Sequence, residues 1–190
     1  MPIVERKTKA AFALWITGLP ASGKSTLAGA LRELLNSEGV DIAVLESDAL
    51  REVFTEHPTY SEEERERFYK QMVYIGALLV EHGVPVIFDA TANRRIYRDR
   101  ARQQIARFLE VYVDSPLDTC MARDPKGIYR QAREGALTTV PGLQSAYEPP
   151  VAPALVVHGD SETPTAAAQR IIRTLEEKSY LTSNPPTSRN

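Results

Sequence analysis

A glycine-rich segment near the N-terminus carries the strongest chemical signal in this sequence. It reads Gly18-Leu19-Pro20-Ala21-Ser22-Gly23-Lys24-Ser25, followed by Thr26, and it matches the pattern G-x-x-x-x-G-K-[ST]. The glycines let the backbone turn closely, so that successive N–H groups face phosphate oxygens. Lys24 supplies a cation for the β- and γ-phosphates, and the Ser25 hydroxyl is a ligand for Mg²⁺. The segment, Thr26 included, therefore predicts a binding site for a nucleoside triphosphate and Mg²⁺.

The residues on either side of this segment predict a strand before it and a helix after it. Residues 11–17 are mostly apolar without alternation, which is typical of a strand covered on both faces. Leucines recur at helical spacing within residues 25–37, and Gly39 stands where a helix end is expected. A strand, a glycine-rich turn and a helix in this order form the context that the phosphate-binding motif requires.

The rest of the chain repeats this alternation of strands and helices. Further strands are expected over residues 42–45, 84–88, 109–113 and 155–157, and helices over 48–56, 61–82, 96–108, 116–124, 127–135 and 165–178. The pattern predicts an α/β fold of the P-loop NTPase type, with a mostly parallel five-stranded sheet and helices on both faces. We expect one domain over residues 1–178 and a disordered tail over 179–190. Ligands of such sheets bind beyond the carboxyl ends of the strands.

Composition and charge exclude several classes of protein. The 190 residues include 23 Lys and Arg against 25 Asp and Glu, a net charge of −2 that disfavours nonspecific nucleic-acid binding. The single cysteine, Cys120, excludes an internal disulfide and a multi-cysteine zinc site. No apolar run reaches the ~20 residues of a membrane helix, and the charged N-terminus lacks a signal-peptide pattern. We expect a soluble cytoplasmic protein without nucleic-acid or membrane partners.

A basic segment late in the chain favours a kinase among the phosphate-loop proteins. The sequence contains no Asn-Lys pair, so the N-K-x-D element of a GTPase is absent. The segment from about 124 to 150 carries Lys126, Arg130 and Arg133, and we expect it to be a lid that excludes water from the γ-phosphate. A solvated loop with ordinary surface charges is the alternative reading.

Several segments, in the same order along the chain, resemble adenylyl-sulfate kinases. Besides the glycine-rich segment, they are Asp48-Ala49-Leu50-Arg51, residues 122–133 (ARDPKGIYRQAR) and residues 142–149 (GLQSAYEP). The resemblance implies transfer of the γ-phosphate of ATP to the 3′-hydroxyl of adenosine 5′-phosphosulfate, with Mg²⁺ as cofactor. It also implies a homodimer.

The resemblance carries roles to individual residues. Lys24 and Asp48 are then catalytic, because Asp48 matches a carboxylate that organises Mg²⁺ and the attacking hydroxyl. Contacts to the acceptor are expected from Asp48, Arg51, Arg65 and Arg95, and contacts to the nucleotide also from Arg123 and Lys126. Phe68, where the family has an asparagine, is a further expected acceptor contact, in place of the family's missing aromatic residue; the alternative is a core position on the apolar face of its helix. From the residues alone, Asp48 could equally be a helix N-cap, and each arginine a partner for nearby glutamates.

The departures from the family pattern lie on the acceptor side. Ala92-Asn93 replaces Ser-Pro, Phe68 replaces an asparagine, and the segment containing Thr138 and Val140 lacks the family's lysine and phenylalanine. Asp89 ends an apolar strand, as in other small-molecule kinases, so we expect it at the metal site with Ser25 and Asp48, or as a helix cap. Two alternatives stay open: a kinase for another nucleotide or phosphorylated metabolite, and a non-catalytic nucleotide-binding regulator.

Overall fold

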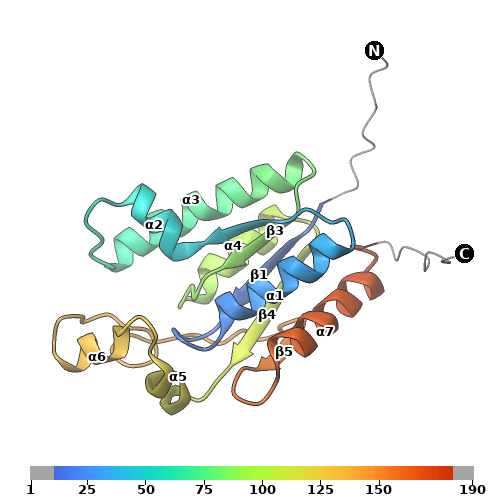
Figure 1. The fold of residues 1–190 in the computed structure, drawn as a ribbon. Coiled ribbons are helices and arrows are strands. Elements are labelled where there is room, and N and C mark those ends of the chain that lie inside the picture. The colour runs from blue at the N-terminus through green and yellow to red at the C-terminus, as the bar shows by residue number, and fades with distance from the viewer. Residues whose placement is uncertain (1–10, 182–190) are drawn as a thin grey trace, which may run out of the picture.

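The computed structural model describes residues 11–181, which form a five-stranded sheet with helices on both faces (Figure 1). The strands are β1 (Ala13–Thr17), β2 (Ala43–Glu46), β3 (Val86–Asp89), β4 (Phe108–Asp114) and β5 (Leu155–His158). The helices are α1 (Lys24–Ser37), α2 (Ser47–Phe54), α3 (Glu62–Glu81), α4 (Arg95–Gln104), α5 (Leu117–Arg123), α6 (Ile128–Arg133) and α7 (Pro164–Glu177). The strand order is β2-β3-β1-β4-β5, and every pairing is parallel. The predicted α/β fold is confirmed.

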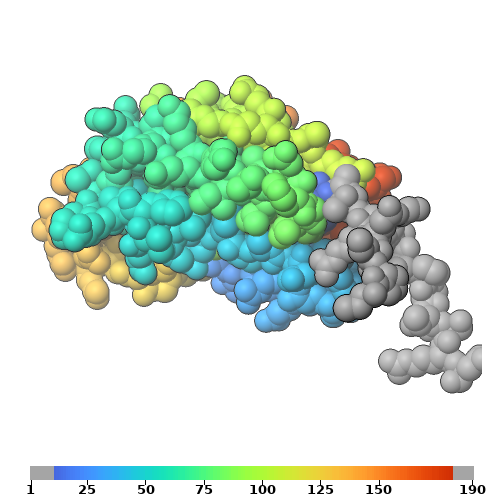
Figure 2. Space-filling view, turned by 90° about the horizontal axis from the view of Figure 1, so that it is seen from above, coloured from blue at the N-terminus to red at the C-terminus, as the bar shows by residue number. Residues whose placement is uncertain are grey.

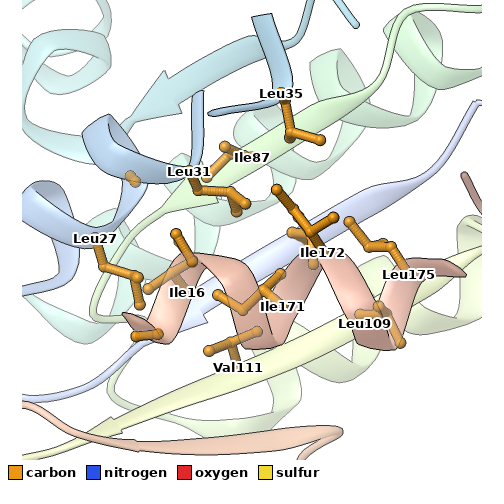
Figure 3. Packing of buried hydrophobic residues seen from close by; sticks show 14 of the residues in the cluster. Ile16, Leu27, Leu31, Leu35, Ile87, Leu109, Val111, Ile171, Ile172 and Leu175 are labelled. Atoms are coloured by element: carbon orange, nitrogen blue, oxygen red, sulfur yellow. The ribbon is translucent and has the colours of Figure 1, made fainter. Parts of the chain in front are cut away.

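The two faces of the sheet bury separate cores, which explains why β1 is apolar at successive positions. Leu14 and Ile16 belong to the core formed with α1 and α7, shown in Figure 3. Ala13 and Trp15 belong to the opposite core, formed with α3 and α4. A strand whose neighbouring side chains point to opposite, equally buried faces cannot alternate apolar and polar residues.

Helix α3 approaches the sheet unusually closely at Gly76. A Cβ added there would lie 2.1 Å from Cζ of Phe88, so only glycine fits between α3 and β3. The helix begins with a side-chain cap, since the Ser61 hydroxyl accepts a hydrogen bond from the Glu64 N–H at 3.2 Å. The Glu64 carboxylate does not return a bond to the Ser61 N–H, as it would in a capping box, and instead accepts the N–H groups of Thr59 and Tyr60.

Helix α4 does not present all of its arginines to solvent. Arg98 is fully buried, and its Nε donates to the Glu110 carboxylate of β4 at 2.6 Å. Its other nitrogens donate to the carbonyl oxygens of Ala92 and Glu148. Arg98 therefore ties α4 and β4 to the turn after β3 and to the C-terminal end of the expected lid.

Residues 180 and 181, which were predicted to belong to a disordered tail, pack against the domain. Tyr180 stacks on Phe12 with ring centroids 6.3 Å apart, and Leu181 packs against the same core, so the chain contributes to the domain beyond Ser179. The remainder of the predicted tail, 182–190, lies outside the described residues. No helix within residues 11–181 combines the length and the apolar character needed to cross a membrane.

Candidate active site

The phosphate-binding segment forms the turn between β1 and α1, where the motif requires it. A Cβ on Gly18 would lie 2.5 Å from the carbonyl oxygen of Val113, so the segment runs close against β4. Lys24 is buried, and its Nζ donates to the carbonyl oxygen of Leu19 at 2.7 Å. Burial lowers the pKa of Lys24, while the nearby carboxylates of Asp89 and Asp48 act to raise it. The ammonium group is thus held over its own loop, at the N-terminus of α1.

Two carboxylates lie beside Lys24, at the carboxyl ends of neighbouring strands. Asp89 ends β3 and is buried; burial raises its pKa, against a hydrogen bond with Ser25 and the charge of Lys24. Asp48 lies in the first turn of α2, which follows β2, and its Oδ2 is 2.5 Å from Nζ of Lys126. Because parallel strands end at one edge of the sheet, β2 and β3 bring these acids together although they are far apart in sequence.

The predicted metal ligands fit Mg²⁺ by their chemistry. Residues 11–181 hold no cluster of three His, Cys, Asp or Glu side chains that could bind a metal ion unaided. Mg²⁺ usually binds through one or two carboxylates, water and substrate phosphates, so a complete protein cage is not required. A hydroxyl–carboxylate pair, Ser25 with Asp89, and the neighbouring Asp48 supply hard oxygen donors of this kind.

A cavity of about 900 Å³ extends from the phosphate-binding segment in two directions. One end is lined by Arg123 and residues 159–164, between β5 and α7. The other end lies at α2 and the N-terminal half of α3, and it is lined by Arg51, Tyr60, Arg65, Tyr69 and Thr139. Figure 1 shows α2 and the α5–α6 segment flanking the carboxyl ends of the strands, and in Figure 2 the α6 region borders the α2–α3 surface at one end of the molecule. Both groups of residues line the same cavity as Lys24.

The α5–α6 segment contacts the phosphate-binding segment directly. Arg123 donates to the carbonyl oxygens of Ser22, at 3.4 Å, and Gly159, at 2.7 Å. The Tyr129 hydroxyl donates to the carbonyl oxygen of Pro20 at 3.0 Å. Cys120, Tyr129, Ala132 and Val140 form a small core of their own, with Leu19 packed against it. Arg123 and Lys126, which were predicted to contact the nucleotide, both line the cavity.

At the far end of the cavity, the two predicted arginines have different partners. Arg51 forms a buried ion pair with Glu64 and lies between two rings, 3.9 Å from the centroid of Phe68 and 4.8 Å from that of Tyr60. Its charge is therefore compensated within the protein.

Arg65 is buried without such compensation. It donates to the carbonyl oxygens of Tyr60 and Thr139, at 2.9 and 2.8 Å, and weakly to Oδ1 of Asn93, at 3.4 Å. Within residues 11–181 it makes no ion pair with a carboxylate. Burial lowers the pKa of Arg65, but a guanidinium stays charged in proteins. A buried cation held only by neutral acceptors provides a site for an anionic ligand.

Two predicted acceptor contacts lie elsewhere. Phe68 is 1% exposed and packs beneath Arg51, so its ring supports the arginine and does not face the cavity. Arg95 is absent from the cavity wall, and its N–H and side chain contact the Glu148 carboxylate. Tyr60 was not among the predicted contacts, yet it lines the cavity, with a φ of 55° and with Arg51 and Arg65 over its ring. Its one sequence signal is its place directly before the Ser61 cap.

The parallel sheet, the phosphate-binding turn and the two-ended cavity define a P-loop kinase. The family model for adenylylsulphate kinase matches residues 10–158. The chain is also 36% identical over 168 residues to the adenylyl-sulfate kinase of Rippkaea orientalis, covering 88% of this chain and 93% of that protein. This chain belongs to the adenylyl-sulfate kinase family.

Two further similarities support the family. The probable adenylyl-sulfate kinase of Pyrococcus abyssi is 35% identical over 170 residues, covering 90% of this chain and 98% of that protein. Among solved structures, the Mycobacterium tuberculosis APS kinase in complex with AMPPNP and APS matches with a TM-score of 0.83 and 32% identity, covering 88% of this chain and 98% of that one.

Proposed function

We propose that this protein transfers the γ-phosphate of ATP to the 3′-hydroxyl of adenosine 5′-phosphosulfate. The observation that carries the proposal is that Lys24 and Arg65, a buried cation without a carboxylate partner among residues 11–181, line one and the same cavity. The M. tuberculosis structure was solved with AMPPNP, an analogue of ATP, and with APS, which is adenosine 5′-phosphosulfate, the proposed acceptor itself. In this chain ATP would bind along the phosphate-binding segment, and the acceptor would occupy the end of the cavity at α2 and α3.

Each side chain near Lys24 then has a distinct task. Lys24 binds the β- and γ-phosphates, and in doing so it exchanges the Leu19 carbonyl oxygen for phosphate oxygens. Ser25, Asp89 and Asp48 would hold Mg²⁺, which would supply positive charge to the phosphates. Asp48 also orients the 3′-hydroxyl toward the γ-phosphate. Since phosphoryl transfer depends mainly on positioning and charge stabilisation, these groups suffice for the reaction.

On the acceptor side, Arg65 would pair with the phosphosulfate group, which brings the negative charge that this guanidinium lacks. Tyr60 would stack on the adenine ring, because its ring lines the cavity and both arginines lie over that ring, within about 6 Å of its centroid. Arg51 would act indirectly, by holding Tyr60 and Glu64 in place.

The segment 124–150 would be the lid of this active site. Its basic residue Lys126 already reaches Asp48 across the cavity. Closure of the segment over ATP would exclude water from the γ-phosphate, which prevents hydrolysis in place of transfer.

A coupled assay of ADP formation with a panel of acceptors tests the proposal. ADP formation that requires adenosine 5′-phosphosulfate, and is absent with adenosine 5′-monophosphate plus sulfate, is the expected result. Turnover with a different nucleotide or phosphorylated metabolite would instead favour the alternative acceptor that the replacements at Phe68, Ala92, Thr138 and Val140 raise. ATP binding without turnover of any acceptor would favour a regulatory protein. The predicted homodimer is tested separately by sedimentation velocity.

A further inference from the structure

Tyr69 combines a rigid ring with a hydroxyl at the acceptor end of the cavity. The residue lies in α3 and is 3% exposed. Its ring stacks on Tyr97 with centroids 4.6 Å apart, meets Phe68 edge-on at 5.2 Å and lies 6.2 Å from Trp15. A ring packed on three sides cannot swing, so the position of the hydroxyl is fixed by the core behind it.

Only half of the hydrogen-bonding capacity of this hydroxyl is used. Its oxygen accepts the N–H of Ala92 at 3.0 Å, in the turn that follows β3. The hydroxyl proton finds no acceptor among residues 11–181. An unpaired buried donor is costly, but Tyr69 is part of the cavity wall, so a ligand in the cavity can accept this proton.

The surroundings of the hydroxyl indicate what kind of atom it meets. Burial raises the pKa of Tyr69, against the opposing charges of Arg51 and Arg65, so the group keeps its proton and remains a donor. Of these two guanidiniums, Arg65 is the one that lacks a carboxylate partner. The ligand atom that Arg65 attracts beside Tyr69 is an anionic oxygen, and such an oxygen is a strong acceptor for a phenolic O–H.

We propose that the Tyr69 hydroxyl donates a hydrogen bond to an anionic oxygen of the acceptor substrate, next to Arg65. This inference rests on the proposed function, because it places the acceptor's phosphosulfate group at that end of the cavity. It makes Tyr69 a specificity-determining residue, since an acceptor without a charged group at this place leaves the donor unpaired.

Calorimetric titration of adenosine 5′-phosphosulfate into protein saturated with ADP and Mg²⁺ tests the inference in the variant Tyr69→Phe. We expect the Kd for adenosine 5′-phosphosulfate to rise about ten-fold, which is roughly 1.4 kcal/mol, while the Kd for ATP is unchanged. Adenosine, which lacks the anionic group, should bind wild type and variant equally. An unchanged Kd for adenosine 5′-phosphosulfate in the variant would overturn the inference, as would an equal loss for adenosine.

Tyr97→Phe is the matched control. It removes the same atom from the partner ring in the stack, where the hydroxyl is buried without a hydrogen bond and lies outside the cavity wall. This control should bind the acceptor like wild type; a loss equal to that of Tyr69→Phe would show that disturbance of the stack explains both results.

A failure of the proposed function is recognised separately. If the wild-type protein itself does not bind adenosine 5′-phosphosulfate, the function is wrong before Tyr69 is tested. If Tyr69→Phe does not fold, a crystal structure of the wild-type protein with ADP and adenosine 5′-phosphosulfate decides. An anionic oxygen within about 3.2 Å of the Tyr69 hydroxyl supports the inference, and a separation that excludes a hydrogen bond contradicts it.

Discussion

Lys126 and Asp48 are 78 residues apart in sequence, yet the Lys126 ammonium lies 2.5 Å from the Asp48 carboxylate. The contact joins the proposed lid to the carboxylate proposed to orient the attacking hydroxyl. The bond to Asp48 raises the pKa of Lys126, and burial acts against it. Both side chains are more than half exposed, so the pair contributes at most about 1 kcal/mol and the phosphates of ATP can compete for the lysine.

Replacement of Lys24 should separate catalysis from folding. Lys24→Ala removes the cation proposed for the β- and γ-phosphates, so kcat should fall by at least about 100-fold. The free energy of unfolding should not fall, because the buried ammonium is itself unfavourable for folding. Burial lowers the pKa of Lys24 for the same reason. Steady-state kinetics and thermal unfolding measure the two effects. Lys70→Ala, at an exposed lysine paired with Glu66, should leave both unchanged; comparable losses in the two variants would contradict the assignment.

Replacement of Asp48 tests its proposed catalytic role. Asp48→Asn keeps the shape of the side chain and removes its charge, so kcat should fall about 100-fold. The free energy of unfolding should change by less than about 1 kcal/mol, because the ion pair with Lys126 is exposed. Glu46→Gln is the control, since this carboxylate is 3.9 Å from the same lysine but is not assigned to the reaction. Near-normal turnover of Asp48→Asn would remove Asp48 from the mechanism.

The buried Arg51–Glu64 pair should make stability depend on pH. Burial acts to raise the pKa of Glu64, but hydrogen bonds from Thr59 and Tyr60 and the charge of Arg51 hold the pKa below its usual value. A carboxyl whose pKa is lower in the folded state stabilises the fold above its unfolded pKa of about 4.3, and this stabilisation is lost as the pH falls below that value.

Glu64→Gln should therefore destabilise the protein at pH 7 by about 3 kcal/mol, because it leaves the Arg51 charge buried without a partner. It should also weaken the fall in stability with acid. Urea unfolding between pH 3 and 7 measures both effects. Glu63→Gln, at an exposed carboxylate in the same first turn of α3, provides the comparison. Equal unfolding curves for the two variants would show that the pair contributes nothing.

Two glycines in helices should respond to alanine in opposite directions. Gly76→Ala places a methyl group against the Phe88 ring, so we expect a loss of about 1–3 kcal/mol from overpacking. Gly29→Ala, within α1, meets nothing within 4 Å and should stabilise the protein by up to about 1 kcal/mol through helix propensity. Chemical denaturation of both variants measures the difference. A stabilised Gly76→Ala would mean that α3 can move away from β3.

The sequence predicted the fold and the phosphate-binding segment because both are encoded locally. Apolar runs specify strands, helical spacing specifies amphipathic helices, and Gly18, Lys24 and Ser25 lie within one turn. Even the break between α5 and α6 follows from neighbouring residues, Asp124 and Pro125. None of these predictions needs a contact between distant parts of the chain.

Which charged side chains of a helix face the site depends on how the helix packs against the rest of the protein. Within α4, Arg98 is fully buried on Glu110 while Arg95 lies outside the cavity on Glu148, although both are basic residues of one helix. Which arginine is buried depends on where a strand places a carboxylate, and sequence spacing within the helix does not contain that information. The same holds for Arg51 and Arg65: one has Glu64 as its partner, the other has only neutral acceptors. The charge of the proposed acceptor site depends on which side chains are buried and on which cations have a carboxylate partner. Both are fixed only when the helices and strands pack together.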